Sequence, residues 1–185
     1  VSRGLGDVYK RQGIYRSRKL DSFEGESVRP TADRTRESLF NILGAATVGA
    51  RFLDAFCGTG AVGIEALSRG ATECVFLDAD RKSAAIAEGN FRRLGIGAKV
   101  TLTRAENYLS GNCGAFDVIF LDPPYRSECG RRALALIGER GLLTEHGVAV
   151  FEHEEPFSGE IEGLSITDER KYGRAYLTFF RRKSL

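Results

Sequence analysis

Short apolar runs alternate with helical patterns along most of this chain. Apolar runs of about five residues predict β-strands, whereas apolar positions that recur every three or four residues predict helices. Strands are expected at 51–55, 74–78, 99–103, 116–122 and 147–152, and helices at 60–68, 81–94 and 128–137. Strands separated by helices imply right-handed crossovers and a parallel sheet that is covered on both faces.

The two flanks of this alternating region follow other patterns. Before it, Thr31 can cap a helix that follows Pro30, and Leu39, Phe40 and Leu43 supply the apolar stripe of that helix. After it, residues 164–170 and 174–182 surround a Lys-Tyr-Gly turn and predict an antiparallel hairpin. The fold class is therefore α/β, with a mostly parallel sheet.

Composition is that of one globular domain, but the charge is unevenly distributed. The chain has 185 residues, 42% hydrophobic and 28% charged, and a net charge of only +2. Six basic residues lie within 1–20 and six within 170–185, whereas 145–169 carries eight acids and no Lys or Arg. Basic ends suit a polyanionic partner. Solvated charge on two termini is the simpler alternative.

The four cysteines show no spacing typical of metal ligands, which predicts a protein without structural metal in a reducing, cytoplasmic compartment. The chain shows neither an apolar run of transmembrane length nor a signal peptide. It also contains no methionine, so residues 1–12 are interpreted as a non-native or unmatched leader.

A glycine-rich loop follows the first predicted strand. Gly58, Gly60 and Gly63 satisfy GxGxxG between a strand and a helix, which by itself is a weak signal of nucleotide binding. Asp54, at the end of the strand, is badly placed beside a pyrophosphate. A carboxylate there suits an ammonium group, such as the one in the methionine part of S-adenosylmethionine (SAM), so the loop favours SAM over NAD.

Asp78 ends the second strand, where a carboxylate can take both hydroxyls of a ribose. The alternative is a helix N-cap, for which Asp80 is better placed. Ala105 and Glu106 follow the third strand and are expected beside the adenine. These positions support nucleoside binding without choosing the cofactor.

The most informative segment is the end of the fourth predicted strand, Asp122, Pro123, Pro124 and Tyr125. An exocyclic NH2 of a base is a poor nucleophile, because its lone pair is delocalised. The Asp122 carboxylate and the Pro123 carbonyl can accept hydrogen bonds from it and free the lone pair, while the two prolines keep the turn stiff. Tyr125 can stack on the base. The turn predicts methyl transfer to an exocyclic nitrogen.

The motifs together resemble the RsmD family of bacterial methyltransferases, which act on N2 of one guanine in 16S ribosomal RNA. They are RPTADRTRESLFNIL (29–43), FLDAFCGTG (52–60), GIEALSRG (63–70) and FLDPPY (120–125). The likeness begins near Gly13 and runs to the end of the chain. It implies a Rossmann-like SAM-dependent methyltransferase with a seven-stranded, mostly parallel sheet whose last strand is antiparallel. The domains expected are a leader (1–12), a basic extension or hairpin (13–28) and a methyltransferase domain (29–185).

The resemblance also assigns residues. The cofactor site is expected to comprise Asp54, Phe56, Gly58, Thr59, Gly60, Asp78, Ala79, Ala105 and Glu106. RNA is expected to contact Arg16, Arg18, Arg29, Thr31, Arg34 and Arg36. For the segment 29–36, the alternative is an ordinary capped helix with exposed arginines. The expected substrate is 16S rRNA in a partly or fully assembled small ribosomal subunit. A monomer without metal or membrane contact is expected.

Other functions fit the sequence less well. A DNA adenine-N6 methyltransferase would need a region that reads base edges, and no insertion leaves room for one. Glutamine methyltransferases usually carry Asn in place of Asp122. A non-catalytic ribosome-assembly factor would have no need of both Asp122 and the glycine loop. An NAD oxidoreductase would need an acid or base at a hydride site, which is missing.

Overall fold

The computed structural model describes residue 14, residues 20–22 and residues 30–184, with the side chains of Pro30 and Thr31 left out. The helices are α2 (Pro30–Leu43), the 3-10 helix η1 (Gly44–Thr47), α3 (Ala61–Ser68), α4 (Arg81–Leu94), α5 (Ala105–Ser110) and α6 (Cys129–Glu139). The strands are β1 (Arg51–Asp54), β2 (Glu73–Asp78), β3 (Val100–Leu102), β4 (Phe116–Leu121), β5 (Leu143–His153), β6 (Leu164–Tyr172) and β7 (Ala175–Arg182).

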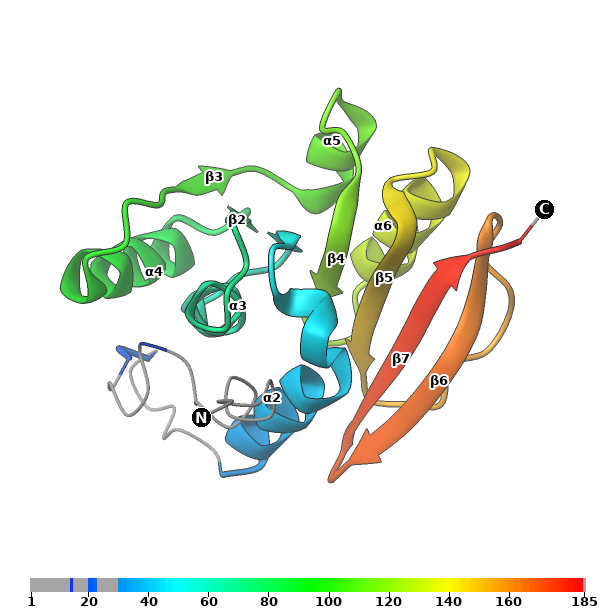
Figure 1. Cartoon of the computed structure of the whole chain (residues 1–185), viewed down its shortest axis with the longest axis horizontal. Helices are drawn as coiled ribbons and strands as arrows, with labels where there is room; N and C mark the ends of the chain where they lie inside the picture. The colour runs from blue at the N-terminus through cyan, green and yellow to red at the C-terminus, as the bar shows by residue number, and fades with distance from the viewer. Residues whose placement is uncertain (1–13, 15–19, 23–29, 185) are drawn as a thin grey trace, which may run out of the picture.

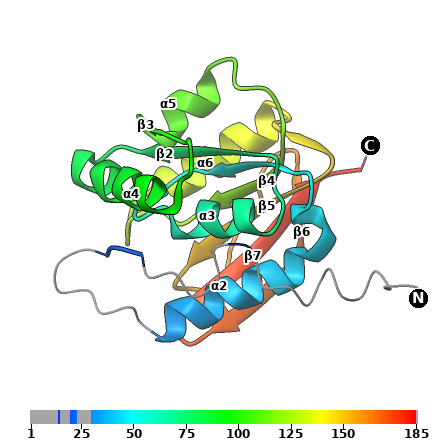
Figure 2. The same cartoon turned by 60° about the vertical axis from the view of Figure 1, so that its left-hand side comes forward.

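The strands form one seven-stranded sheet in the order β3-β2-β1-β4-β5-β7-β6 (Figure 1). The pairs from β3 to β5 are parallel, and β7 is antiparallel to both of its neighbours. This confirms the predicted Rossmann-like sheet with an antiparallel last strand. Figure 2 shows helices on both sides of it, with α2, α3 and α4 on one face and α5 and α6 on the other.

Alternation of side chains along the strands divides the core between these two faces. Phe52 and Phe120 point to the face that Leu39 and Phe40 of α2 cover. Leu121, one residue after Phe120, packs instead with the α6 side chains on the opposite face. Because both faces are covered, nearly every residue of β4 is apolar and buried.

Two elements differ from the sequence-based expectation. Helix α5 was not expected; it has only six residues, and Arg104 at its N-cap makes no side-chain capping bond. Strand β5 begins at Leu143 rather than Gly147, since its register with β4 shifts after the Leu143–Phe116 pair. The polar residues in this irregular stretch interrupt the apolar run that marks a strand in the sequence.

Candidate active site

The carboxyl ends of β1, β2 and β4 meet at one edge of the sheet. Strand β1 lies between β2 and β4, so the strand order reverses at β1, and a crevice is expected outside such a reversal. Asp54, the last residue of β1, is opposite Phe120, and the Ala55 N–H donates to the Phe120 carbonyl over 3.0 Å. Asp122 lies only two residues beyond Phe120. The two loops that the sequence singled out are therefore neighbours.

The glycine loop has a conformation that requires glycine. Gly58 and Gly60 have φ values of +53° and +82°, which side chains rarely adopt. At Gly58 a side chain would meet no atom within 4 Å, so this part of the loop presents open backbone. Gly63 has another role, because an added Cβ would lie 2.2 Å from the Phe76 ring. It lets α3 pack closely on β2.

Asp78 organises this loop. Its Oδ2 accepts the Gly58 N–H over 2.9 Å, and its Oδ1 accepts the Asp80 N–H over 2.9 Å. The N-cap of α4 is Asp80, whose carboxylate accepts the Ser83 N–H over 2.8 Å. The sequence-based choice of Asp80 as the cap is thereby confirmed, and Asp78 remains at the carboxyl edge of the sheet.

Asp54 is a buried carboxylate at the carboxyl end of β1. Its Oδ2 accepts the Gly63 N–H of α3 over 3.0 Å, and only 1% of the residue is exposed. Burial raises the pKa of Asp54 to about 7; the Gly63 hydrogen bond opposes this shift, and the charges of Asp122 and Asp78 add to it. Such a group is stabilised in its charged form when a cation lies beside it.

Asn90 of α4 supports the glycine loop from behind, and sequence reasoning did not identify it. Its side chain is fully buried, and its Nδ2 donates to the Thr59 carbonyl over 2.9 Å. The same amide accepts the Asp21 N–H over 2.7 Å. In the sequence, Asn90 could have been found only as a polar residue among the apolar positions of α4. Asn90 thus joins the loop to the segment that precedes α2.

The turn after β4 is held by its own hydrogen bonds. Ser127 donates from both its backbone N–H and its hydroxyl to the Pro124 carbonyl, over 3.2 and 2.6 Å. Arg126 has a φ of +55°, a strained value for arginine, and its guanidinium lies 4.9 Å from the Tyr125 ring centroid. Tyr125 is 62% exposed. The turn is therefore stiff and presents an aromatic ring to solvent.

Glu152 of β5 is a second residue that the sequence interpretation missed. In the register of β4 and β5, Leu121 lies opposite Phe151, which makes Asp122 and Glu152 neighbours at the edge. Desolvation raises the pKa of Asp122 to about 6, although water moderates this shift because the residue is open to solvent on one side. Burial and the Asp122 charge raise the pKa of Glu152. An acidic residue that ends a strand beside β4 was the available signal.

The remaining expected cofactor residues lie in loops or helix starts that follow β1, β2 and β3. Phe56 is partly buried against the core, and Ala79 is exposed. Ala105 is buried at the start of α5, and Glu106 lies in the first turn of that helix. Since β3 pairs with the end of β2 in parallel, these positions share the carboxyl edge.

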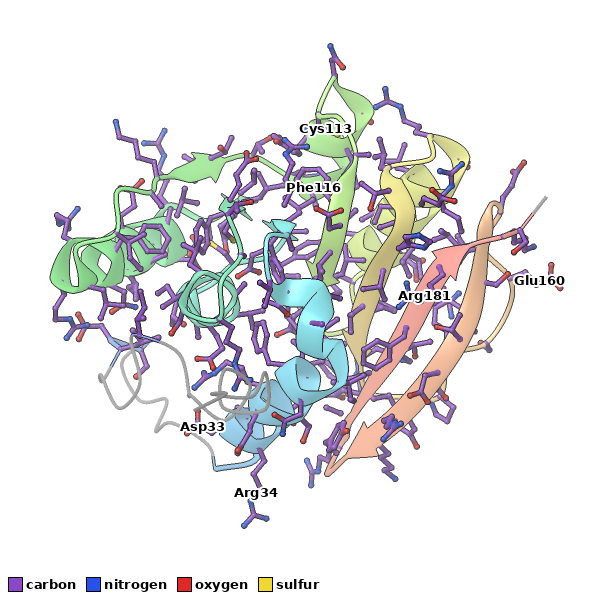
Figure 3. The ribbon with its side chains drawn as sticks, in the orientation of Figure 1. Asp33, Arg34, Cys113, Phe116, Glu160 and Arg181 are labelled. Atoms are coloured by element: carbon purple, nitrogen blue, oxygen red, sulfur yellow. The ribbon has the colours of Figure 1, made fainter. Side chains whose placement is uncertain are left out.

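The expected RNA-binding residues are only partly described. Arg16, Arg18 and Arg29 lie outside the described residues, and Thr31 is described only as backbone of α2. Arg34 is exposed and extends away from α2 (Figure 3). Arg36 forms an ion pair with Asp33 at 3.0 Å. Of this set, Arg34 is the side chain whose charge faces solvent.

Neither the cysteines nor the acidic residues indicate a metal centre. Cys57, Cys74, Cys113 and Cys129 are all free thiols. Among the described residues, no three His, Cys, Asp or Glu side chains are grouped so that they could hold a metal ion. In the same part of the chain, no helix has the length and apolar character needed to cross a membrane.

Known proteins resemble this chain over nearly its whole length. A family profile described as conserved hypothetical protein 95 matches residues 11–181. Ribosomal RNA small subunit methyltransferase D of Escherichia coli strain K12 is 34% identical over 152 residues, which cover 82% of this chain and 77% of that protein. The chain belongs to the RsmD family. It is accordingly a methyltransferase.

Solved structures agree with this membership of the RsmD family. The Escherichia coli yhhF protein superposes with a TM-score of 0.83 at 31% identity, and the match covers 94% of this chain and 96% of that one. A Thermus thermophilus 16S rRNA N2 G1207 methyltransferase, RsmC, was solved with AdoMet and guanosine. It matches with a TM-score of 0.66 at 18% identity over 87% of this chain and 45% of its own, which shows a shared fold.

Proposed function

We propose that this RsmD-family protein transfers the methyl group of SAM to the exocyclic N2 of a guanine in 16S ribosomal RNA. The observation that carries the proposal is the juxtaposition of two loops: the Asp122–Tyr125 turn ends β4 beside the glycine loop that ends β1. The first loop has the groups that an exocyclic amine needs, and the second has open backbone for a cofactor.

The residues of the glycine loop fit SAM. Gly58 presents open backbone, and Asp78, which is already fixed by two backbone N–H groups, is the carboxylate that we assign to the ribose hydroxyls. Asp54 supplies a negative charge in a desolvated place, which suits the ammonium of the methionine part. SAM, when bound, supplies a methyl group on a sulfonium, so the protein has mainly to position the acceptor.

The turn after β4 positions that acceptor. Since the Pro124 carbonyl is engaged by Ser127, the Pro123 carbonyl and the Asp122 carboxylate are the two acceptors that we assign to the N2 amino group. Their hydrogen bonds strengthen as positive charge develops on nitrogen, which lowers the barrier rather than only binding the substrate. The exposed Tyr125 ring stacks on the base and contributes about 1–3 kcal/mol.

We assign Glu152 to the same base. Guanine presents an N1–H next to its N2 amino group, and a carboxyl oxygen beside Asp122 is placed to accept it. Adenine has no hydrogen at N1 and accepts there instead, so the ionised form of Glu152, which can only accept, would favour guanine. A base within a helix would have to be flipped out to reach the pair.

The proposal includes the wider context of the enzyme. Its substrate is 16S rRNA within a small ribosomal subunit, it acts in the cytoplasm as a monomer, and residues 13–28 form an extension of the methyltransferase domain. Two contacts support the extension: Leu20 packs against the α4 core, and Asp21 bonds to Asn90. The name of the Escherichia coli relative supports the ribosomal target.

The test is a methyl-transfer assay with radiolabelled SAM and 30S particles from a strain that lacks this methylation, beside naked 16S RNA and duplex DNA. Label in 16S RNA that digests to N2-methylguanosine, and that is lost with Asp122→Ala, is the expected result. Label as N6-methyladenine in DNA would overturn the RNA assignment. SAM binding without transfer to any substrate would favour a non-catalytic assembly factor.

A further inference from the structure

The basic C-terminal segment is divided into two groups by the fold. In the sequence, six Lys and Arg residues fall within 170–183 without an intervening acid. Strands β6 and β7 are antiparallel, with Tyr172 opposite Ala175 at one end of the pair and Leu164 opposite Arg182 at the other. Residues 170–175, the hairpin tip, and residues 181–183 therefore lie at opposite ends of the same two strands.

The hairpin tip lies at the edge of the sheet that carries the active site. Strand β6 is antiparallel to β7, β7 is antiparallel to β5, and β5 is parallel to β4. Hence β6 runs in the direction of β4, and the hairpin tip points to the same side as the Asp122 turn. Figures 1 and 2 both show it next to the first turns of α2. Tyr172 of the tip packs against the core cluster that contains Leu39 and Phe40 of α2.

The charges at this edge face solvent. Lys171 and Arg174 are exposed, and Lys171 lies 5.4 Å from the centroid of the Tyr176 ring. Arg34 is exposed on α2, the helix that contacts β6. Among the described residues, none of these three side chains has an ion-pair partner. We name these three cations, which lie on two adjoining elements, the basic ridge.

The opposite end of the hairpin is also basic, but it lies at the other edge of the sheet. Arg181 donates to the His146 carbonyl over 2.6 Å, and Lys183 lies 3.9 Å from a carboxylate oxygen of Glu160. The two ends carry similar numbers of basic residues in the sequence, but only the hairpin tip lies at the edge of the sheet that carries the Asp122 turn.

We propose that this ridge (Lys171 and Arg174 of the hairpin tip with Arg34 of α2) binds phosphate groups of the RNA that flanks the target base. The inference rests on the proposed function and extends it to the C-terminal hairpin. Phosphate contacts fix the register of a nucleic acid on a protein without reading its sequence. The ridge would thus hold the RNA while Tyr125 and Asp122 hold the base.

The experiment compares two double variants that remove the same charge. Lys171→Ala/Arg174→Ala removes two charges from the ridge, and Arg182→Ala/Lys183→Ala removes two from the far end. Binding of 16S RNA and of 30S particles is measured by filter retention from 50 to 200 mM salt, together with kcat, KM for 30S particles, SAM affinity and thermal unfolding.

For the ridge variant we expect a KM for 30S particles raised about tenfold or more, with unchanged SAM affinity and unchanged kcat at saturation. The slope of log K against log salt should fall by about 1–2, roughly one for each RNA phosphate that the variant no longer neutralises. The far-end variant should change KM by less than about twofold. Because Lys171 also contacts Tyr176, Arg174→Glu alone is measured as a variant that removes no such ring contact.

Several outcomes would overturn the inference. Equal losses in both double variants would show an effect of net charge, and an unchanged KM in the ridge variant would remove the ridge from binding. Weaker binding to 30S particles with intact binding to naked RNA would assign the ridge to a ribosomal protein. Failure of the proposed function can be told apart from failure of this inference, because in that case the protein without any substitution transfers no methyl group to RNA.

Discussion

The backbone N–H of Gly58 donates a 2.9 Å hydrogen bond to the carboxylate of Asp78, so the last residue of β2 fixes the loop that follows β1. The other oxygen of Asp78 accepts the Asp80 N–H. One carboxylate thus joins two loops at the carboxyl edge of the sheet, and the conformation of the glycine loop depends on a residue 20 positions farther along the chain.

This relationship predicts the effect of Asp78→Asn. The amide has one oxygen and cannot accept both N–H groups in place of the two carboxylate oxygens. We expect SAM binding to weaken at least tenfold in calorimetric titration, while the free energy of unfolding falls by only about 1 kcal/mol. Glu73→Gln, at the exposed start of the same strand, is the control and should leave SAM binding unchanged. Normal SAM binding by Asp78→Asn would contradict this role.

Asp54 predicts a pH dependence of stability. Burial raises its folded-state pKa from 3.8 to about 7, so between these values the folded carboxyl holds a proton that the unfolded one has released. The free energy of unfolding, taken relative to that of Asp54→Asn, should therefore fall as the pH rises from about 4 to 7 and then level off. Each unit by which the folded-state pKa is raised corresponds to about 1.4 kcal/mol of this fall. Urea unfolding of both proteins at pH 5, 6, 7 and 8 measures this, and a constant difference would refute it.

The buried carboxyl of Asp54 also predicts that SAM binding is coupled to the release of a proton. An ammonium beside Asp54 stabilises the carboxylate, so binding should release a proton, and SAM affinity should rise between pH 5.5 and 7. Calorimetry in two buffers with different ionisation enthalpies counts the released protons. The Asp54→Asn variant should show neither the proton release nor the rise. If its titration matched that of the unchanged protein, another group would be responsible.

Gly63→Ala tests the close contact between α3 and β2. The added methyl would lie 2.2 Å from the Phe76 ring and 2.7 Å from the Cys74 sulfur, so the sheet and helix must move apart. We expect a loss of about 1–3 kcal/mol in chemical unfolding, in spite of the higher helix propensity of alanine. Gly97→Ala, which would meet no atom within 4 Å, should be nearly neutral. Equal stability of the two variants would show that the contact relaxes freely.

The Asp122–Glu152 pair predicts a pH–rate profile. Asp122 must be ionised to accept hydrogen bonds from the amino group, and a bound base would exclude the water that moderates the rise of its pKa to about 6. The kcat at saturating SAM should therefore rise with pH through about 6. Because the cause is desolvation, Glu152→Gln should keep this acidic limb while it lowers kcat/KM for the RNA. A rate that does not change between pH 5 and 7 would contradict the role of Asp122.

Much of the fold was determined by local sequence patterns. The apolar runs and the period of 3.6 residues predicted the central strands and helices, since burial on one or both faces leaves a periodic trace in a single segment. The C-terminal hairpin was also predicted correctly. Helix α5 and the start of β5 were not, because a six-residue helix and an irregular strand leave no such period.

The sequence by itself also placed the candidate chemistry, because Asp54, Asp78 and Asp122 all end parallel strands, and such ends share one edge. Only the tertiary structure pointed to Asn90 and Glu152, because their partners lie far away in the chain. It alone separated the basic tail into a ridge at the active edge and a group at the far end. The sequence shows which residues of the tail are basic, but it does not specify the edge of the sheet at which each of them lies. The antiparallel pairing of β6 with β7 decides this, because it places the two basic groups at opposite ends of the same strands.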